Sequence, residues 1–215
     1  VIIDGYGALE DALSVLSEDP EVRIFTDPST LNHHVSSHIS DLFEPDSVIC
    51  GRSPVVLKKS VRTESEIENL RQTYIDDGLA MECFLYWLDK EVSSGREVTE
   101  WEASERLTDF REQIPGYRGN SFENISAYGP NAALPHYSTP REDSAVIRPS
   151  GLYLVDSGGQ YLTGTTDITR TVPMGECSGL EKEDYTLVLK GMIDLSMAVF
   201  PKGTAGCQID AIARM

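Results

Sequence analysis

The chain has 215 residues, of which 40% are hydrophobic and 25% are charged, as in a globular protein that can bury a sizeable core. Its 35 acidic and 18 basic residues give a formal net charge of −17, which argues against a nucleic-acid-binding surface. No apolar run approaches the roughly 20 residues that span a bilayer, and no low-complexity tract or repeat is present. We therefore expect neither a nucleic acid nor a membrane as partner.

Four scattered cysteines, Cys50, Cys83, Cys177 and Cys207, indicate a reducing, cytoplasmic environment. No CxxC pair is present, which excludes a zinc ribbon and a thioredoxin-type pair. We interpret the four residues as free, buried thiols. The sequence starts without a signal-peptide pattern and without an initiator methionine, so we interpret it as a piece of a longer protein.

Residues 1–59 show an alternation of helix and strand patterns. Residues 8–16 have one apolar face, residues 22–26 are rich in strand-forming types, and a polar segment then leads to a strand-like run at 47–50. This order is typical of α/β folds. Because 59 residues are few for such a unit, we expect the C-terminal part of a larger α/β domain.

Residues 54–60 (PVVLKKS) are interpreted as a linker, and a second domain is expected over residues 60–215. Three capping boxes predict the start of three helices in it, at Thr63–Glu66, Thr99–Glu102 and Ser178–Glu181. Apolar stripes at three- and four-residue steps follow these boxes and predict the buried faces: Ile67, Leu70, Tyr74, Met81, Leu85, Leu88 and Val92; Ala103, Leu107, Phe110 and Ile114; Tyr185, Val188, Met192, Leu195 and Val199.

Between the second and third predicted helices the pattern changes to strands, over residues 121–127, 152–156 and 167–172. The pair Gly158–Gly159 favours a turn. Helices on one side of an antiparallel sheet define an α+β fold class for this domain.

Two acidic residues are candidate metal ligands. Side chains alternate along a strand, so Asp156 shares a face with Leu152 and Leu154, and we expect that face to point inward. A buried carboxylate is costly unless it is paired or metal-bound. Asp167 opens the next strand and can meet Asp156, and two carboxylates favour a hard divalent ion such as manganese. The alternative is an acid that caps a turn, with Asp167 paired to Arg170.

Histidines are the other candidates. His136 lies in a loop rich in glycine and proline, GPNAALPHY, where a histidine can act as acid, base or hydrogen-bond donor. His34 and His38 are one helical turn apart, but no HExxH motif or acidic third ligand accompanies them, so a solvated helix face is favoured. No GxGxxG, P-loop or GxSxG motif supports a nucleotide-binding or serine-hydrolase fold.

These motifs carry a resemblance to a known family. The segment GLYLVDSGGQYLTGTTDITRTV closely resembles the metal-binding hairpin of the pita-bread metallopeptidases, and GPNAALPHY resembles their substrate-histidine loop. The strings TTDITRT and GPN…HY together are most similar to the cytosolic aminopeptidase P (Xaa-Pro aminopeptidase) family. TESEIENLRQTYIDDGLAMECFLYWLDKEV and LVLKGMIDLSMAVFPKGTAG resemble helices on either side, so the match covers residues 60–215 and extends more weakly over 1–59.

The resemblance implies a fold and a site. Residues 60–215 would be the N-terminal half of a pita-bread catalytic domain, and residues 1–59 the end of a non-catalytic, creatinase N-terminal-like domain. The family holds two divalent ions, usually manganese. Asp156 would chelate one and Asp167 would bridge both, while His136 would contact the substrate near the scissile carbonyl. The family's further ligands, one histidine and two glutamates, are expected beyond Met215, so the chain alone would hold part of the active site.

The implied activity is removal of the N-terminal residue from peptides with proline at the second position, by attack of a metal-bridging hydroxide on the scissile carbonyl. The remainder of the catalytic domain and a second copy in a homodimer would be the protein partners. Two alternatives stay open: a prolidase-like dipeptidase, and a catalytically inactive pita-bread module that binds other proteins.

Overall fold

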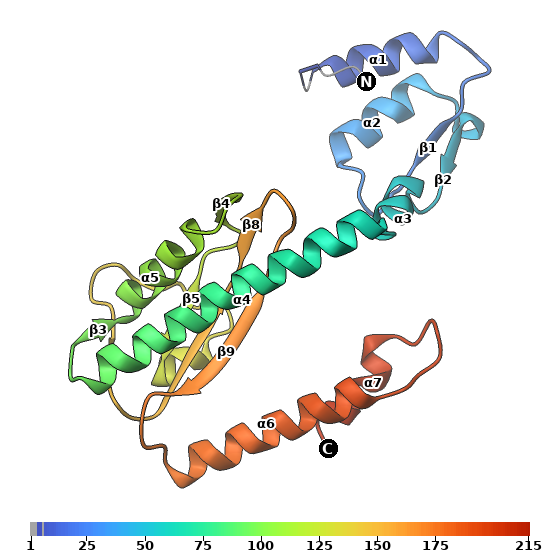
Figure 1. Ribbon diagram of the computed structural model, residues 1–215. Helices are drawn as coiled ribbons and strands as arrows, with labels where there is room; N and C mark the ends of the chain where they lie inside the picture. The colour runs from blue at the N-terminus through green and yellow to red at the C-terminus, as the bar shows by residue number, and fades with distance from the viewer. Residues whose placement is uncertain (1–3, 6) are drawn as a thin grey trace. The chain divides into compact units, whose positions relative to one another are not determined.

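The computed structural model describes residues 4, 5 and 7–215, which divide into a unit ending at Thr63 and a unit over Glu64–Met215 (Figure 1). The sequence places the domain boundary after residue 59, and which domain each unit belongs to stays a prediction. Residues 54–60 are not a linker but helix α3 (Pro54–Ser60). Pro54 presets the backbone of the first turn, and Lys58 and Lys59 favour the C-terminal end of the helix dipole.

The first unit has the predicted order of helix and strand. Helices α1 (Ala8–Ser17) and α2 (His33–Leu42) alternate with strands β1 (Ile24–Thr26) and β2 (Val48–Cys50), and a 3₁₀ turn precedes β2. The strands pair in parallel, with Ile24 opposite Val48. Leu13, Ile39 and Phe43 form a small core.

Two helices form one layer of the second unit: α4 (Glu64–Ser93) and α5 (Glu100–Glu112). The Thr99 side chain caps α5 by accepting a hydrogen bond from the backbone N–H of Glu102 (3.1 Å), as predicted. Phe84 and Leu88 of α4 and Leu107 of α5 are fully buried in one cluster with the sheet. Of the predicted α4 stripe, Met81, Leu88 and Val92 are buried, whereas Tyr74 is exposed.

Three antiparallel strands form the main sheet in the order β5 (Ile125–Tyr128), β7 (Leu152–Ser157), β9 (Ile168–Pro173). They match the three predicted strands, with β5 starting later than expected. Two short antiparallel pairs were absent from the prediction. These pairs are β3 (Val98–Thr99) with β6 (Val146–Ile147), and β4 (Tyr117–Asn120) with β8 (Gly159–Tyr161).

The sheet face that packs on the helices is the opposite of the one predicted. Tyr153, Val155 and Ser157 are buried, and Tyr153 and Val155 belong to the helix-facing core. Leu152, Leu154 and Asp156 do share a face, but it is the half-buried one. Alternation fixes which residues share a face, whereas the packing of α4 and α5 decides which face is covered.

The chain ends in helices α6 (Gly179–Met197) and α7 (Gly206–Ala213). The predicted capping box is present: Ser178 accepts from the N–H of Glu181, and Glu181 accepts from the N–H of Ser178. The helices pack closely at Gly191, where a Cβ atom would lie 2.4 Å from the carbonyl oxygen of Ala213. The apolar stripe predicted for this helix is not core in this chain, since Val188 of α6 is 74% exposed and Val199, beyond the end of α6, is 99% exposed.

The described part of the chain tests the expectation about the cysteines. The cysteines are free, but Cys50, Cys83 and Cys207 are exposed and Cys177 is half-buried, so the prediction that they are buried is wrong. Cys83, for example, lies on α4 beside the buried Phe84 but on a face that no described segment covers. Among residues 4, 5 and 7–215, none of the helices is both long and apolar enough to cross a membrane.

Candidate active site

Asp156 lies in β7 of the main sheet, and Asp167 directly precedes the neighbouring strand β9, which begins at Ile168. Asp156 of β7 lies directly opposite Thr169 of β9, and the Thr169 hydroxyl donates a hydrogen bond to Asp156 Oδ1 (2.7 Å). Asp167 precedes Thr169 by two residues, so alternation puts it on the same face, diagonal to Asp156. Such diagonal neighbours are separated by about 7–8 Å, within reach of side chains that lean toward each other. Asp156 is half-buried and Asp167 is exposed.

The alternative role for Asp167 finds no support in the described chain. No ion pair joins Asp167 to Arg170 there, and Arg170 Nη1 donates to the backbone oxygen of Thr169 instead (2.7 Å). The two aspartates are an all-oxygen donor set, which suits a hard divalent cation. Residues 4, 5 and 7–215 nevertheless bring no three acidic, histidine or cysteine side chains together as a metal site. The pair is therefore a partial ligand set.

A groove of about 810 Å³ runs along the sheet face that holds Asp156. Strands β7 and β9 form its floor, helix α6 forms one wall, and the segment after β5 contributes its rim. The lining side chains are mostly apolar and include Leu152, Leu154, Thr169, Tyr185, Val188 and Met192. The half-buried face of the sheet is thus a surface on which an extended, partly apolar ligand can lie beside Asp156.

His136 lies in what we call the His136 loop, residues 129–139, which starts with a 3₁₀ helix (Gly129–Ala133) directly after β5. Gly129, Pro130 and Ala132 of this loop line the groove, and His136 itself is exposed farther along. At the end of the loop, Thr139 is buried and exchanges hydrogen bonds of 3.1 Å with the backbone of Ser126. The structure thus brings the loop, although not the His136 ring, to the groove beside the aspartate strands.

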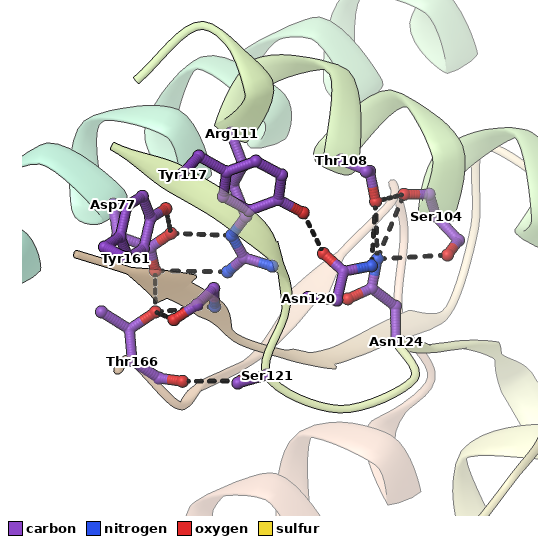
Figure 2. Close-up of polar contacts among 11 residues, drawn as sticks. Asp77, Ser104, Thr108, Arg111, Tyr117, Asn120, Ser121, Asn124, Tyr161 and Thr166 are labelled. Atoms are coloured by element: carbon purple, nitrogen blue, oxygen red, sulfur yellow. Dashed lines mark hydrogen bonds and ion pairs between the residues drawn. The ribbon is translucent and has the colours of Figure 1, made fainter. Parts of the chain in front are cut away.

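A buried ion pair holds the segment between the two aspartates (Figure 2). Asp77 of α4 and Arg111 of α5 are both fully buried, with Arg111 Nε 2.7 Å from Asp77 Oδ1 and Nη2 3.3 Å from Oδ2. Asp77 also accepts hydrogen bonds from the Tyr161 hydroxyl (2.5 Å) and the Thr166 hydroxyl (2.8 Å). Thr166 directly precedes Asp167, so the core helices fix the residue next to the candidate ligand.

The backbone between Asp156 and Asp167, a segment that we call the aspartate hairpin, is also closely packed. Thr166 Oγ1 accepts a hydrogen bond from the N–H of Gly159 (2.9 Å), and the Ser121 hydroxyl donates to the Thr166 carbonyl (3.0 Å). A Cβ atom on Gly158 would lie 2.0 Å from that carbonyl oxygen. Gly158 and Gly159 are therefore close-packing positions at the β7–β8 junction, and the prediction of a simple turn there is wrong.

Burial and the Asp77 carboxylate both raise the pKa of Tyr161. Its removal from water is the main cause that raises the pKa of the phenol, and the hydrogen bond to Asp77 raises this pKa further. The Tyr161 hydroxyl therefore stays protonated and keeps donating to Asp77.

Sequence reasoning missed Asp77 and Arg111. The available signal was a charged residue within an apolar helix face, since Asp77 lies one turn before the buried Met81 and Arg111 one turn after the buried Leu107.

Among the described residues, no group of three metal-binding side chains includes the histidines of the first unit. His34 Nε2 lies 2.7 Å from Glu10 Oε1 at the surface, where both side chains are largely exposed. This contact is the main cause that lowers the pKa of the Glu10 carboxyl. Together with the exposed position of His34 on α2, it fits the solvated helix face favoured from the sequence.

Comparisons with known proteins add a family and relatives. The model of metallopeptidase family M24 matches residues 68–215. A probable Xaa-Pro aminopeptidase P from Tuber melanosporum is 44% identical over 169 residues, which cover 79% of this chain and 27% of that protein. The chain thus spans about a quarter of that relative's length.

Solved structures give the same picture at the level of the fold. The X-prolyl aminopeptidase from Caenorhabditis elegans, described as a cytosolic enzyme with a di-nuclear active site, matches with a TM-score of 0.83 and 32% identity. This match covers 97% of the present chain and 34% of that one. An Xaa-Pro dipeptidase from Bacillus anthracis matches with a TM-score of 0.69 and 27% identity, over 96% of this chain and 55% of that one.

Proposed function

The chain belongs to metallopeptidase family M24, and we propose that the protein removes the N-terminal residue from peptides that have proline at the second position. The family and the α+β, pita-bread fold class predicted from the sequence are thereby confirmed. The observation that carries the proposal is the placement of Asp156 on β7 and of Asp167 directly before the adjacent strand β9, in a chain 44% identical to a probable Xaa-Pro aminopeptidase P.

Asp156 and Asp167 are the proposed ligands from this chain for two divalent ions, with manganese as the expected metal. The bound ions would supply Lewis acidity and lower the pKa of water at the reaction centre. The donor chemistry fits, because both side chains offer only oxygens and share a face. Thr169 orients one of them by its hydrogen bond to Asp156 Oδ1. One histidine and two glutamates from outside this sequence are proposed to complete the set.

His136 is the proposed catalytic and substrate-binding residue of the loop. An N–H of its ring donates a hydrogen bond to the scissile carbonyl oxygen, and this bond strengthens as negative charge develops there. The exposed ring on a loop whose ends are fixed fits this role, because it can meet a substrate without disturbing the core.

Apolar contacts have to supply much of the recognition of proline. The proline nitrogen carries no N–H, so an enzyme cannot hold the substrate by a hydrogen bond from that amide. The groove beside Asp156 offers apolar side chains such as Leu152 and Leu154, and we place the proline side of the substrate there. A cytosolic location is a further part of this proposal, and the cytosolic relative from C. elegans supports it. A homodimer is proposed as well.

A prolidase-like dipeptidase is the second candidate, favoured by the likeness to the Xaa-Pro dipeptidase from B. anthracis. A panel of Xaa-Pro dipeptides and Xaa-Pro-Xaa tripeptides, tested on the full natural polypeptide with manganese, separates the two. We expect hydrolysis of the tripeptides. Cleavage confined to dipeptides would replace the first candidate by the second, and cleavage of neither would favour an inactive binding module.

A variant series tests the aspartates themselves. In Asp167→Asn we expect lower manganese stoichiometry and a loss of activity, measured by metal analysis and peptide hydrolysis. Asp89→Asn, which removes an exposed carboxylate from α4, is the matched control and should change neither. Unchanged stoichiometry and activity in Asp167→Asn would remove Asp167 from the site.

A further inference from the structure

A second fully buried carboxylate lies at the start of α5. Glu100 has an exposed fraction of 0% and is the first residue of the helix. Its Oε1 accepts hydrogen bonds from the backbone N–H of Tyr128 (2.6 Å) and from Asn131 Nδ2 (3.0 Å). Its Oε2 accepts from the Tyr137 hydroxyl (2.7 Å) and again from Asn131 Nδ2 (3.2 Å).

All of these donors belong to one segment of the chain. Tyr128 is the last residue of β5, Asn131 lies in the 3₁₀ helix of the His136 loop, and Tyr137 directly follows His136. Asn131 Nδ2 also donates to the Tyr137 hydroxyl oxygen (3.1 Å), which joins the two halves of the loop. One carboxylate thus fixes both ends of the stretch that presents His136.

The core holds Glu100 in turn. Its backbone oxygen accepts a hydrogen bond from the Ser126 hydroxyl (2.7 Å), and Ser126 Oγ also lies 2.7 Å from the hydroxyl of the buried Tyr153. The N–H of Glu100 donates to the Ala145 carbonyl (2.9 Å). The core therefore fixes the position of Glu100. In contrast, Leu134, Pro135 and His136, which lie between Asn131 and Tyr137 in the loop, are exposed.

No basic side chain among the described residues forms an ion pair with Glu100. Its negative charge is stabilised by neutral donors and by the N-terminal end of α5, where the helix dipole favours an anion. A buried charge without such donors would be costly. The stabilisation of Glu100 therefore depends on the conformation of the loop, and the loop conformation depends on Glu100.

We propose that Glu100 is the positioning residue for His136: it holds the His136 loop in the one arrangement that directs the histidine at the substrate. This role rests on the proposed function of His136. In this role Glu100 acts through its hydrogen bonds to Tyr128, Asn131 and Tyr137, and not by contact with the substrate or the metal. It also explains why asparagine and tyrosine accompany the histidine in the string GPNAALPHY.

A double-mutant cycle in the full natural polypeptide tests the proposal. Glu100→Gln keeps the size of the side chain but puts an amide N–H₂ group against the donors of the loop. We expect kcat to fall by up to about 10²-fold with a smaller change in KM, because displacement of a reacting group by about 1 Å can cost that much. His136→Ala should lower kcat further, and the double variant should match His136→Ala alone. Losses that multiply in the double variant would overturn the proposal.

Hydrogen exchange of the backbone amides of residues 129–139 gives a readout that does not depend on catalysis. We expect faster exchange in this loop in Glu100→Gln, with unchanged exchange in the hairpin of Asp156 and Asp167 and unchanged metal content. Unchanged exchange in the loop would overturn the role of Glu100. If instead His136→Ala keeps the wild-type kcat while exchange changes as expected, the catalytic role of His136 fails and the positioning by Glu100 stands.

Two further variants keep the test interpretable. Tyr137→Phe removes a single donor and should give a smaller effect of the same kind, which serves if Glu100→Gln does not fold. Glu102→Gln removes a carboxylate from the same turn of α5, where Glu102 pairs with Arg96 at the surface and does not touch the loop. It should leave kcat and loop exchange unchanged. A loss of kcat in Glu102→Gln equal to that of Glu100→Gln would assign the effect to helix charge and overturn the proposal.

Discussion

Two buried carboxylates, Asp77 on α4 and Glu100 on α5, hold the two segments that contain the candidate site residues, and they do so by different means. Asp77 is paired with a buried cation, Arg111, and also accepts from Tyr161 and Thr166 of the aspartate hairpin. Glu100 accepts only from neutral donors, all near or within the His136 loop.

This difference predicts that Asp77 stabilises the fold, whereas Glu100 sets the conformation of a loop. Because the charge of Asp77 is compensated by Arg111, between two helices of the core, loss of Asp77 should affect the stability of the whole second unit. The donors to Glu100 lie on a surface loop, so its loss should affect the order of that loop more than the core.

The largest expected effect is on stability. Asp77→Asn leaves the Arg111 guanidinium buried without its counter-charge, and removal of one partner of a buried ion pair costs about 3–5 kcal/mol. Arg111 Nη1 already has no hydrogen-bond partner in the described structure, so Arg111 has little means of compensation. We expect a loss of this size in the free energy of unfolding, measured by denaturant titration.

The double variant Asp77→Asn/Arg111→Gln and the control Asp76→Asn sharpen this test. Replacing both charges should cost less than the sum of the single losses, because no uncompensated charge remains. Asp76 is the neighbouring aspartate, bonded only to Gln72 at the surface (2.8 Å), and its replacement should have little effect. Additive losses in the double variant would mean that the pair is not coupled.

The second prediction concerns a variant that should lower activity strongly and change stability little. His136→Ala should lower kcat by about 10²–10³-fold, the usual cost of removing one donor to a developing oxyanion. The melting temperature should change little, because the ring is exposed. Steady-state kinetics and thermal unfolding measure both, with the exposed Leu134→Ala as control. A wild-type kcat in His136→Ala would contradict the proposed mechanism.

Local signals in the sequence predicted most of the fold. The capping residues Thr99 and Ser178 gave the starts of α5 and α6, and alternation gave the residues that share a face of β7. The same signals could not show which face α4 and α5 cover, because that depends on packing between distant segments. The interpretation of residues 54–60 as a linker is wrong because their proline and lysines favour the two ends of a helix.

Some residues of the candidate site could be predicted from local sequence and others could not. Asp156, Asp167 and His136 lie in recognisable strings, so their types and spacing predicted them. Asp77 and Glu100 were missed because their partners are distant in sequence: Thr166 is 89 residues from Asp77, and Tyr137 is 37 residues from Glu100. Their surroundings form only when the helices pack on the sheet.

The third prediction compares the tyrosines that donate to the two carboxylates. Burial, followed by the hydrogen bond to Glu100, raises the pKa of Tyr137 to about 12. A raised pKa in the folded state contributes stability that is present below the unfolded pKa of about 10 and is lost as the pH rises through about 12. Stability should therefore fall over this window, and less steeply in Tyr137→Phe, as measured by denaturant titration at each pH.

At neutral pH the Tyr137→Phe change should cost about 1.5–3 kcal/mol at most, the range for a hydrogen bond to a charged group. Tyr161→Phe serves as the matched variant at Asp77, because the pKa of Tyr161 is raised mainly by burial and then by its bond to that carboxylate. Equal changes in loop exchange in both variants would break the comparison, since only Tyr137 belongs to the His136 loop.

The smallest expected effect is at the hydrogen bond that orients Asp156. Thr169→Val keeps the shape of the side chain and removes the donor to Asp156 Oδ1, at a cost of about 0.5–1.5 kcal/mol in stability. Because groups that orient a metal ligand typically change metal affinity by about 10–100-fold, manganese binding should weaken near the lower end of that range. Thr165→Val is the control, since Thr165 donates to Gln160 (2.7 Å) and not to an aspartate. Manganese titration by calorimetry measures both variants. If Thr169→Val binds manganese as the wild type does, the orientation of Asp156 comes from the strand alone, and the hairpin network at Asp77 is sufficient to position both ligands.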